Sequence, residues 1–303
     1  MKITDIKLHT VKFGDTGARG AAMGESQYWG GGWAAETLIA NPMSVHPKYS
    51  RIRSLWMGGG QDPYVIEIFT DEGVSGFCAN YGGGVFACAI IEQHFKRFLI
   101  GQDPYNIQLI WDQMNRATLP YGLGGVTSMA MAGVDTALYD LVAKAQNLPV
   151  YKILGGQTKE SIPCYVTIHP DYVDHWRDRG FLGDGMEIMV DCYLSWDIEF
   201  TTRVAGRVRD FDVKWFEDPL QNGWATESNR ILRDRISPTL LATGNLEFHP
   251  KAFHDIIHNH ATDIIQPIFS VLEGEPLPVN GRITLDPDKP GFGVELKREM
   301  LAP

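Results

Sequence analysis

The sequence predicts an α/β protein in two parts, an N-terminal α+β domain followed by a parallel (β/α) barrel domain. Up to about residue 145, a strand, a hairpin and a long amphipathic helix follow one another, whereas from about residue 161 short apolar runs alternate with amphipathic segments. The polar residues that end three of these runs are 26 and 28 positions apart. Each interval fits one strand–loop–helix–loop unit of a parallel sheet.

The composition indicates a cytoplasmic globular protein. The chain has 303 residues, 44% hydrophobic and 21% charged, with a formal net charge of −10. Because nucleic acids and acidic membrane surfaces are bound by basic faces, this charge argues against both as partners. We expect no signal peptide, and no apolar run approaches the ~18 residues of a membrane span. The four cysteines lack CxxC spacing, so we interpret them as reduced and mostly buried: Cys78, Cys88, Cys164 and Cys192.

The first part begins with a strand and a hairpin. Apolar residues between Ile6 and Phe13 come near to the alternation of a half-buried strand. The glycine-rich stretch from Gly14 to Gly32 is predicted to be a mobile surface loop. Two apolar runs, 64–69 and 74–77, then flank a turn in which Gly73 supplies the positive φ, which predicts a hairpin.

A helix with one buried face is expected between Val126 and Gln146, because its apolar residues recur at spacings of three and four. These residues are Ala130, Val134, Ala137, Leu138, Leu141 and Ala145. After it come five strand candidates: Ile162–Ile168, Glu187–Val190, Val213–Phe216, Thr239–Ala242 and Asp263–Ile265.

Polar residues directly follow three of these strands, in the pairs Val190-Asp191, Phe216-Glu217 and Gly244-Asn245. The carboxyl ends of successive parallel strands converge on one mouth, where the active sites of barrels are built. Mg²⁺ prefers oxygen ligands, so carboxylates on adjacent strand ends are its expected holders. The alternative is that Asp191 and Glu217 cap the helices that follow them, and the residues alone leave the two interpretations equal.

The barrel is too short to be complete. A full (β/α)₈ barrel needs roughly 200–250 residues, whereas 110 residues lie between Ser161 and Ser270 and 17 between His169 and Glu187. We therefore expect an incomplete barrel, with segments missing near 183/184 and near 267/268. Either the protein is truncated there or the sequence omits segments, and we favour omission.

Three stretches of the sequence resemble the mandelate racemase branch of the enolase superfamily, and the last of them is similar to the C-terminal segment of L-rhamnonate dehydratases. The stretches are Ala132–Asp140 continuing to Leu148–Gly156; the ordered set Val190-Asp191, Trp215–Pro219 and Ala242–Gly244; and Glu275-Pro276, Pro278–Ile283 and Asp288–Leu296. The resemblance implies an N-terminal capping domain of residues 1–145, to which 271–303 return, and a modified barrel domain of residues 146–270.

The resemblance also implies a Mg²⁺ cofactor, a small sugar-acid substrate and a homo-oligomer. Asp191 and Glu217 match two of the family's metal ligands. Asn245 stands where rhamnonate dehydratases have Glu. Its carbonyl oxygen is an acceptable but weaker Mg²⁺ ligand, and Glu247 is the competing third ligand or a substrate contact.

Two further positions match substrate contacts of the family. Arg53 corresponds to an arginine whose guanidinium fork suits a carboxylate or sugar hydroxyls, and the alternative is a surface arginine. Trp33 lies in the glycine-rich loop that sets substrate choice in the family. Gly32 stands where a histidine is expected beside it, which puts L-rhamnonate itself in doubt as the substrate.

No catalytic base is assigned. The family's histidine and the Asp that follows Gln-Pro are absent, since Ile268 follows Pro267 and no later histidine exists. His254 and His258 are interpreted as an exposed helix face rather than a metal site. The leading hypothesis is a Mg²⁺-dependent hydro-lyase that turns a sugar acid into a 2-keto-3-deoxy acid. The alternatives are an epimerase or racemase on the same scaffold and a catalytically inactive sugar-acid-binding relative.

Overall fold

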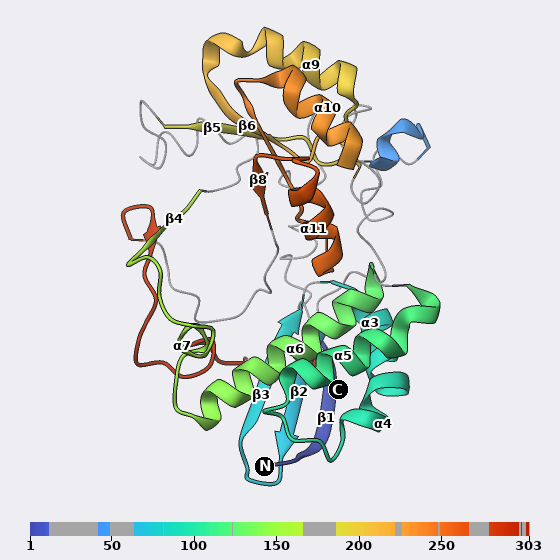
Figure 1. Ribbon diagram of the computed structural model, residues 1–303, viewed down its shortest axis with the longest axis vertical. Helices are drawn as coiled ribbons and strands as arrows, with labels where there is room; N and C mark the ends of the chain where they lie inside the picture. The colour runs from blue at the N-terminus through green and yellow to red at the C-terminus, as the bar shows by residue number, and fades with distance from the viewer. Residues whose placement is uncertain are drawn as a thin grey trace. The chain divides into compact units, whose positions relative to one another are not determined.

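The computed structural model describes residues 1–11, 42–48, 64–80, 82–122, 124–165, 186–221, 226–247, 249–266, 279–296, 298 and 301–302. These residues form two compact units (Figure 1), one from 1–11, 64–165 and 279–302 and the other from 42–48 and 186–266. The predicted glycine-rich loop, Trp33, Arg53 and the predicted junctions near 183/184 and 267/268 lie outside the described residues. No helix in the described ranges is long and apolar enough to span a membrane.

The first unit contains a four-stranded antiparallel sheet in the order β10-β1-β2-β3. Its strands are β1 (Ile3–Val11), β2 (Tyr64–Thr70), β3 (Ser75–Asn80) and β10 (Leu301–Ala302). The predicted hairpin is confirmed, because β2 pairs with β3 and Gly73 adopts φ 79° in the turn between them. A positive φ of this kind is open to glycine at little steric cost.

Helices cover one face of this sheet (Figure 1). They are α3 (Gly84–Ile90), the π-helical turn η3 (Ile91–Phe95), α4 (Lys96–Leu99), α5 (Ile107–Thr118) and α6 (Val126–Ala145). The 3₁₀ turn η4 (Leu119–Tyr121) follows α5, and α7 (Val150–Ile153) follows α6. A further 3₁₀ turn, η2 (Pro42–Val45), belongs to the second unit. Five of the six predicted core positions of α6 are buried, and Ala145 at its end is half-buried.

Two glycines allow α6 to lie directly on the sheet. A Cβ at Gly76 would come within 2.4 Å of the Ala137 carbonyl oxygen, and one at Gly133 within 2.2 Å of the Tyr64 hydroxyl. Both distances are far below van der Waals contact. The Tyr64 hydroxyl donates a hydrogen bond to the Met129 carbonyl oxygen at 3.1 Å, so the polar end of this buried ring is satisfied.

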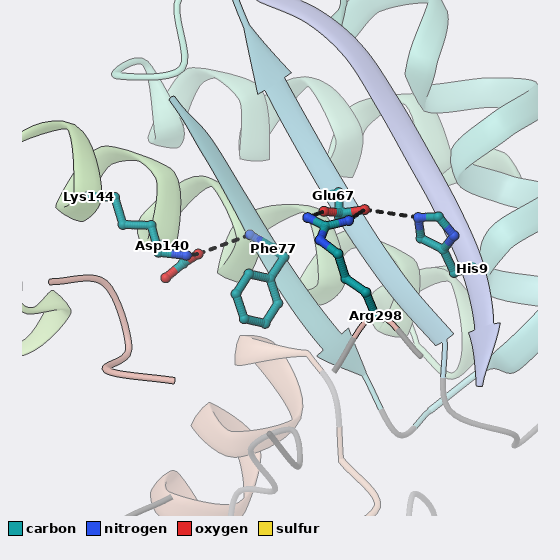
Figure 2. Close-up of polar contacts among 6 residues, drawn as sticks. All are labelled: His9, Glu67, Phe77, Asp140, Lys144 and Arg298. Atoms are coloured by element: carbon teal, nitrogen blue, oxygen red, sulfur yellow. Dashed lines mark hydrogen bonds and ion pairs between the residues drawn. The ribbon is translucent and has the colours of Figure 1, made fainter. Parts of the chain in front are cut away.

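A buried carboxylate joins α6, the sheet and the C-terminal segment (Figure 2). Asp140 is 1% exposed and accepts hydrogen bonds from the Phe77 amide at 3.0 Å, the Phe292 amide at 3.2 Å and Lys144 Nζ at 2.6 Å. Gly291, just before Phe292, has φ 69°, and a Cβ there would meet Asp140 Oδ1 at 2.2 Å. The C-terminal segment can therefore approach this carboxylate because residue 291 is glycine.

A second buried carboxylate, Glu67 on β2, contacts one residue of the neighbouring strand β1 and one residue just before β10 (Figure 2). Its Oε2 lies 3.0 Å from His9 Nε2 on β1, and its Oε1 accepts from Arg298 Nη2 at 2.6 Å. Beyond Arg298, β10 pairs with β1 at Thr10 and Ala302. These contacts place the described end of the chain in the first unit, while the domain limits 145/146 and 270/271 stay a prediction.

One predicted strand is wrong in its partner and extent. Within the described part of Ile162–Ile168, β4 covers Ile162–Pro163 and pairs antiparallel with β9 (Arg282–Ile283) in the first unit, not with a parallel barrel strand. Ile162 is 50% exposed, so this apolar residue contributes little to a core. A short apolar run gives no information on its partner, because partner choice depends on distant residues.

The second unit is a parallel α/β sheet in the order β5-β6-β7-β8 (Figure 1). Its strands are β5 (Ile188–Asp191), β6 (Val213–Glu217), β7 (Leu240–Thr243) and β8 (Ile264–Ile265), close to the four predicted. The connecting helices are α9 (Ile198–Arg207), with the 3₁₀ turn η6 (Arg209–Phe211), α10 (Thr226–Ile236) and α11 (Pro250–His258). Within the described ranges β5 and β8 each pair with one neighbour, so these four strands do not close into a barrel.

Replacing Asp140 tests its role as a junction. Asp140→Ala leaves two amides and a lysine without their shared acceptor, and we expect the free energy of unfolding to fall by about 3 kcal/mol. Asp112→Ala removes an exposed partner of Arg116 on α5 and should cost below ~0.5 kcal/mol. Urea denaturation followed by circular dichroism measures both. Equal losses for the two variants would contradict the assignment.

A half-buried acid in α6 predicts a pH dependence of stability. Burial raises the pKa of the Asp135 carboxyl to about 6. The folded state therefore binds this proton more tightly than the unfolded state does. Protonation of Asp135 stabilises the folded state at low pH, and this contribution is lost as pH rises through about 6. Asp135→Asn should raise the free energy of unfolding by about 2 kcal/mol at pH 8, and by less at pH 5. A gain that does not depend on pH would contradict this.

Candidate metal centre at the strand ends

Asp191 and Glu217 are the last residues of neighbouring parallel strands and are register partners. Adjacent strands lie about 4.8 Å apart, and residues at matched positions point to the same side of the sheet. The two carboxylates therefore leave the same edge of the sheet from adjacent strands. This is the arrangement in which two side chains can share one cation.

Asn245 supplies the third oxygen of this edge. It follows β7 by two residues, after Gly244, whose φ of 118° turns the chain. Asn245 Oδ1 is buried and accepts no hydrogen bond from any residue in the described ranges. A buried acceptor without a donor costs roughly 1–3 kcal/mol. A cation ligated by this oxygen removes that cost, so the residues present fit an oxygen-preferring divalent ion.

Glu247, the competing ligand, lies in the turn that follows. Its amide donates to the Gly244 carbonyl at 3.1 Å, and its side chain is half-buried. No group of three or more His, Cys, Asp and Glu side chains among the described residues could hold a metal. Glu247 therefore forms no such group with Asp191 and Glu217, whereas Asn245 has a buried oxygen without a donor among the described residues, which favours Asn245 over Glu247.

The edge is strongly negative. Burial raises the pKa of the Cys192 thiol well above its usual range, and the nearby carboxylates of Asp191, Asp218 and Glu217 raise it further. The charges of these three acids therefore all act on the buried Cys192 thiol beside the sheet edge. Like charges gathered in this way repel one another, and a divalent cation relieves the repulsion.

Local hydrogen bonds orient the two candidate carboxylates. Asp191 Oδ1 accepts from the Tyr193 amide at 2.9 Å, inside a turn where Tyr193 and Leu194 have φ of 53° and 60°. Glu217 Oε2 lies 3.4 Å from Trp215 Nε1 on the same strand.

Asp218 and Thr243 also lie at the ends of these strands and were not among the predicted site residues. Asp218 is 2% exposed and accepts a hydrogen bond from Thr243 Oγ1 at 2.6 Å. Asp218 stands within the Trp215–Pro219 motif, directly after the strand. The sequence offers one indication that Asp218 is buried, because Pro219 and Leu220 follow it directly.

The histidines at the start of α11 and within it are not assigned as the catalytic base. His249 caps α11 through Nδ1, which accepts from the Lys251 amide at 3.1 Å. In the neutral ring the proton is then on Nε2, which is a donor rather than a base. His254 and His258 stack on the exposed face of α11, with ring centroids 5.7 Å apart. Their interpretation as an exposed helix face is confirmed.

Comparison with known proteins agrees with both units. Residues 45–155 match the N-terminal domain of the mandelate racemase/muconate lactonizing enzyme family, and residues 172–274 match the enolase C-terminal domain-like model. A putative L-rhamnonate dehydratase from Caldivirga maquilingensis is 26% identical, over 99% of this chain and 96% of its own length. An L-rhamnonate dehydratase from Saccharopolyspora erythraea is 27% identical, over 99% and 98%.

Solved structures show the same fold. A crystal structure of L-rhamnonate dehydratase from Gibberella zeae has a TM-score of 0.78 and 25% identity, over 100% of this chain and 96% of that one. L-talarate/galactarate dehydratase from Salmonella typhimurium LT2, liganded with Mg and L-lyxarohydroxamate, has a TM-score of 0.68 and 20% identity, over 78% and 83%.

The alignments also bear on the length of the barrel. The match to the Caldivirga protein runs over 393 residues, whereas this chain has 303, so at least 90 aligned positions have no residue of this chain. This difference agrees with an incomplete barrel, while the places of the missing segments stay a prediction.

The two matched domains, their order along the chain and the parallel sheet lead to one conclusion: the chain is a member of the mandelate racemase/muconate lactonizing enzyme branch of the enolase superfamily, with an N-terminal capping domain and a C-terminal enolase-like barrel domain.

Proposed function

We propose that this protein is a Mg²⁺-dependent hydro-lyase that acts on a sugar acid, removing the α-proton and expelling the 3-hydroxyl to give a 2-keto-3-deoxy acid. The observation that carries the proposal is the buried Asn245 Oδ1, to which none of the described residues donates, at the edge where Asp191 and Glu217 end adjacent strands. The rhamnonate and talarate/galactarate dehydratases among its relatives support the substrate class.

The reaction needs charge stabilisation, because a proton α to a carboxylate is very weakly acidic. When bound, Mg²⁺ supplies positive charge next to the carboxylate oxygens on which negative charge gathers as that proton leaves. Asp191, Glu217 and Asn245 would hold the ion. The two carboxylates of this set carry the charge that attracts a divalent cation, and the neutral amide adds an oxygen ligand without a further charge.

A second candidate is a sugar-acid-binding protein without dehydratase activity. The observation that favours it is the shortfall of at least 90 positions against the Caldivirga relative. In such a protein Asp191, Glu217 and Asn245 would still hold the cation and orient the acid group of the ligand. The two candidates differ in product formation, not in metal binding.

Direct metal titration tests the ligand set. We expect Asp191→Asn, Glu217→Gln and Asn245→Leu each to weaken Mn²⁺ binding at least about tenfold, measured by electron paramagnetic resonance with Mg²⁺ in competition. Asp212→Asn is the matched control, because exposed Asp212 stands at the opposite end of β6 from Glu217 and the exchange removes the same charge. Loss of binding in the control, or unchanged affinity in the three variants, would reject this set.

Product analysis separates the functions. The protein is incubated with Mg²⁺ and a panel of acid sugars that includes L-rhamnonate, in D₂O, and 2-keto acid is measured beside deuterium at the α-carbon. We expect 2-keto acid from one member of the panel and none from the Glu217→Gln variant. Deuterium uptake without keto acid would indicate an epimerase or racemase. Binding with neither result would indicate the non-catalytic protein.

A further inference from the structure

Asp218 is a buried carboxylate beside the candidate metal centre that is not one of the three proposed ligands. We propose that Asp218 is the positioning residue of this centre: it fixes the ends of β5, β6 and β7 relative to one another and adds a third negative charge next to Glu217. The inference rests on the proposed metal centre and extends it to a residue with a distinct role.

The contacts of Asp218 reach both neighbours of its own strand. Its amide donates to the Ala242 carbonyl on β7 at 2.9 Å, and its carbonyl accepts from the Leu194 amide, just beyond β5, at 2.7 Å. Its side chain accepts from Thr243 Oγ1, also on β7, at 2.6 Å. Leu194 follows Asp191 by three residues and Thr243 precedes Asn245 by two. Asp218 is thus hydrogen-bonded to residues within three positions of Asp191 and Asn245, and it directly follows Glu217.

The backbone of Asp218 also determines where Glu217 ends its strand. Asp218 has φ 41°, in the left-handed region, which a non-glycine residue enters at a cost of order 1–2 kcal/mol. This turn ends β6 directly after Glu217, while the Glu217 carbonyl still accepts from the Cys192 amide at 2.8 Å. The three bonds made by Asp218 hold the turn in place against its intrinsic cost.

The side chain of Asp218 contributes charge as well as geometry. Thr243 Oγ1 donates to this carboxylate at 2.6 Å, a short O–H···O distance. Asp218 is 2% exposed, so its charge is weakly screened by water. A weakly screened carboxylate directly after Glu217 adds negative charge that attracts a divalent cation, without occupying a ligand position.

Two near-isosteric exchanges separate charge from hydrogen bonding. Asp218→Asn keeps the shape, an oxygen acceptor for Thr243 and tolerance of a left-handed backbone, but removes the charge. Thr243→Val keeps the charge and removes the hydrogen bond. Mn²⁺ affinity is measured by electron paramagnetic resonance for both variants, for the double variant and for the Asp212→Asn control, with circular dichroism to verify folding.

We expect Asp218→Asn to weaken Mn²⁺ binding about tenfold and Thr243→Val several-fold, with the control unchanged. The double variant should lose less than the product of the two single effects, because both act through one contact. Parent-like affinity in both single variants, with a lowered melting temperature as their sole effect, would overturn the positioning role. If Asp218→Asn does not fold, the result for Thr243→Val decides.

These outcomes are distinct from those that test the proposed function. A parent protein that binds Mn²⁺ but yields no 2-keto acid fails as a dehydratase, and the variants still report on Asp218. A parent protein that binds no Mn²⁺ overturns the metal centre and the role of Asp218 together.

Discussion

The parallel register of β5, β6 and β7 is the constraint on which the candidate centre depends. It places Asp191 opposite Glu217 and brings the end of β7 alongside them. Strand pairing fixes the spacing of the backbone, and polar residues at the strand ends then meet without any long-range ordering of loops. The helices between the strands are amphipathic and bury one face against the sheet, so the same hydrophobic packing that stabilises the unit also positions its polar edge.

Buried polar groups in the two units differ in one informative respect. Asp140 has three hydrogen-bond donors and Glu67 is held by His9 and Arg298, so both are satisfied by the protein itself. Asn245 Oδ1 is equally hidden from water, yet none of the described residues donates to it. The first two therefore explain how the C-terminal segment is bound, whereas the third fits the proposal that a cation binds at this edge.

The strands of the second unit and their polar ends could be predicted from the sequence because both signals are local. An apolar run marks the strand, and the polar residue after it marks the end that opens on the mouth. Contacts between residues that are far apart in the chain could not be predicted from the sequence. The role of Asp218 depends on Thr243, 25 positions away, and the pairing of β4 depends on β9, more than 100 positions away. The choice between Asn245 and Glu247 required the burial of a single oxygen atom.

The central claim is that one cation joins the three strand ends. The most direct measurement is a crystal structure of the protein with Mn²⁺, in which anomalous scattering locates the ion. The account predicts one peak at roughly the 2.1 Å typical of Mg²⁺–oxygen bonds from a carboxylate oxygen of Asp191, one of Glu217 and Asn245 Oδ1. A peak bound by Glu247 in place of Asn245, or no peak at this edge, would contradict it.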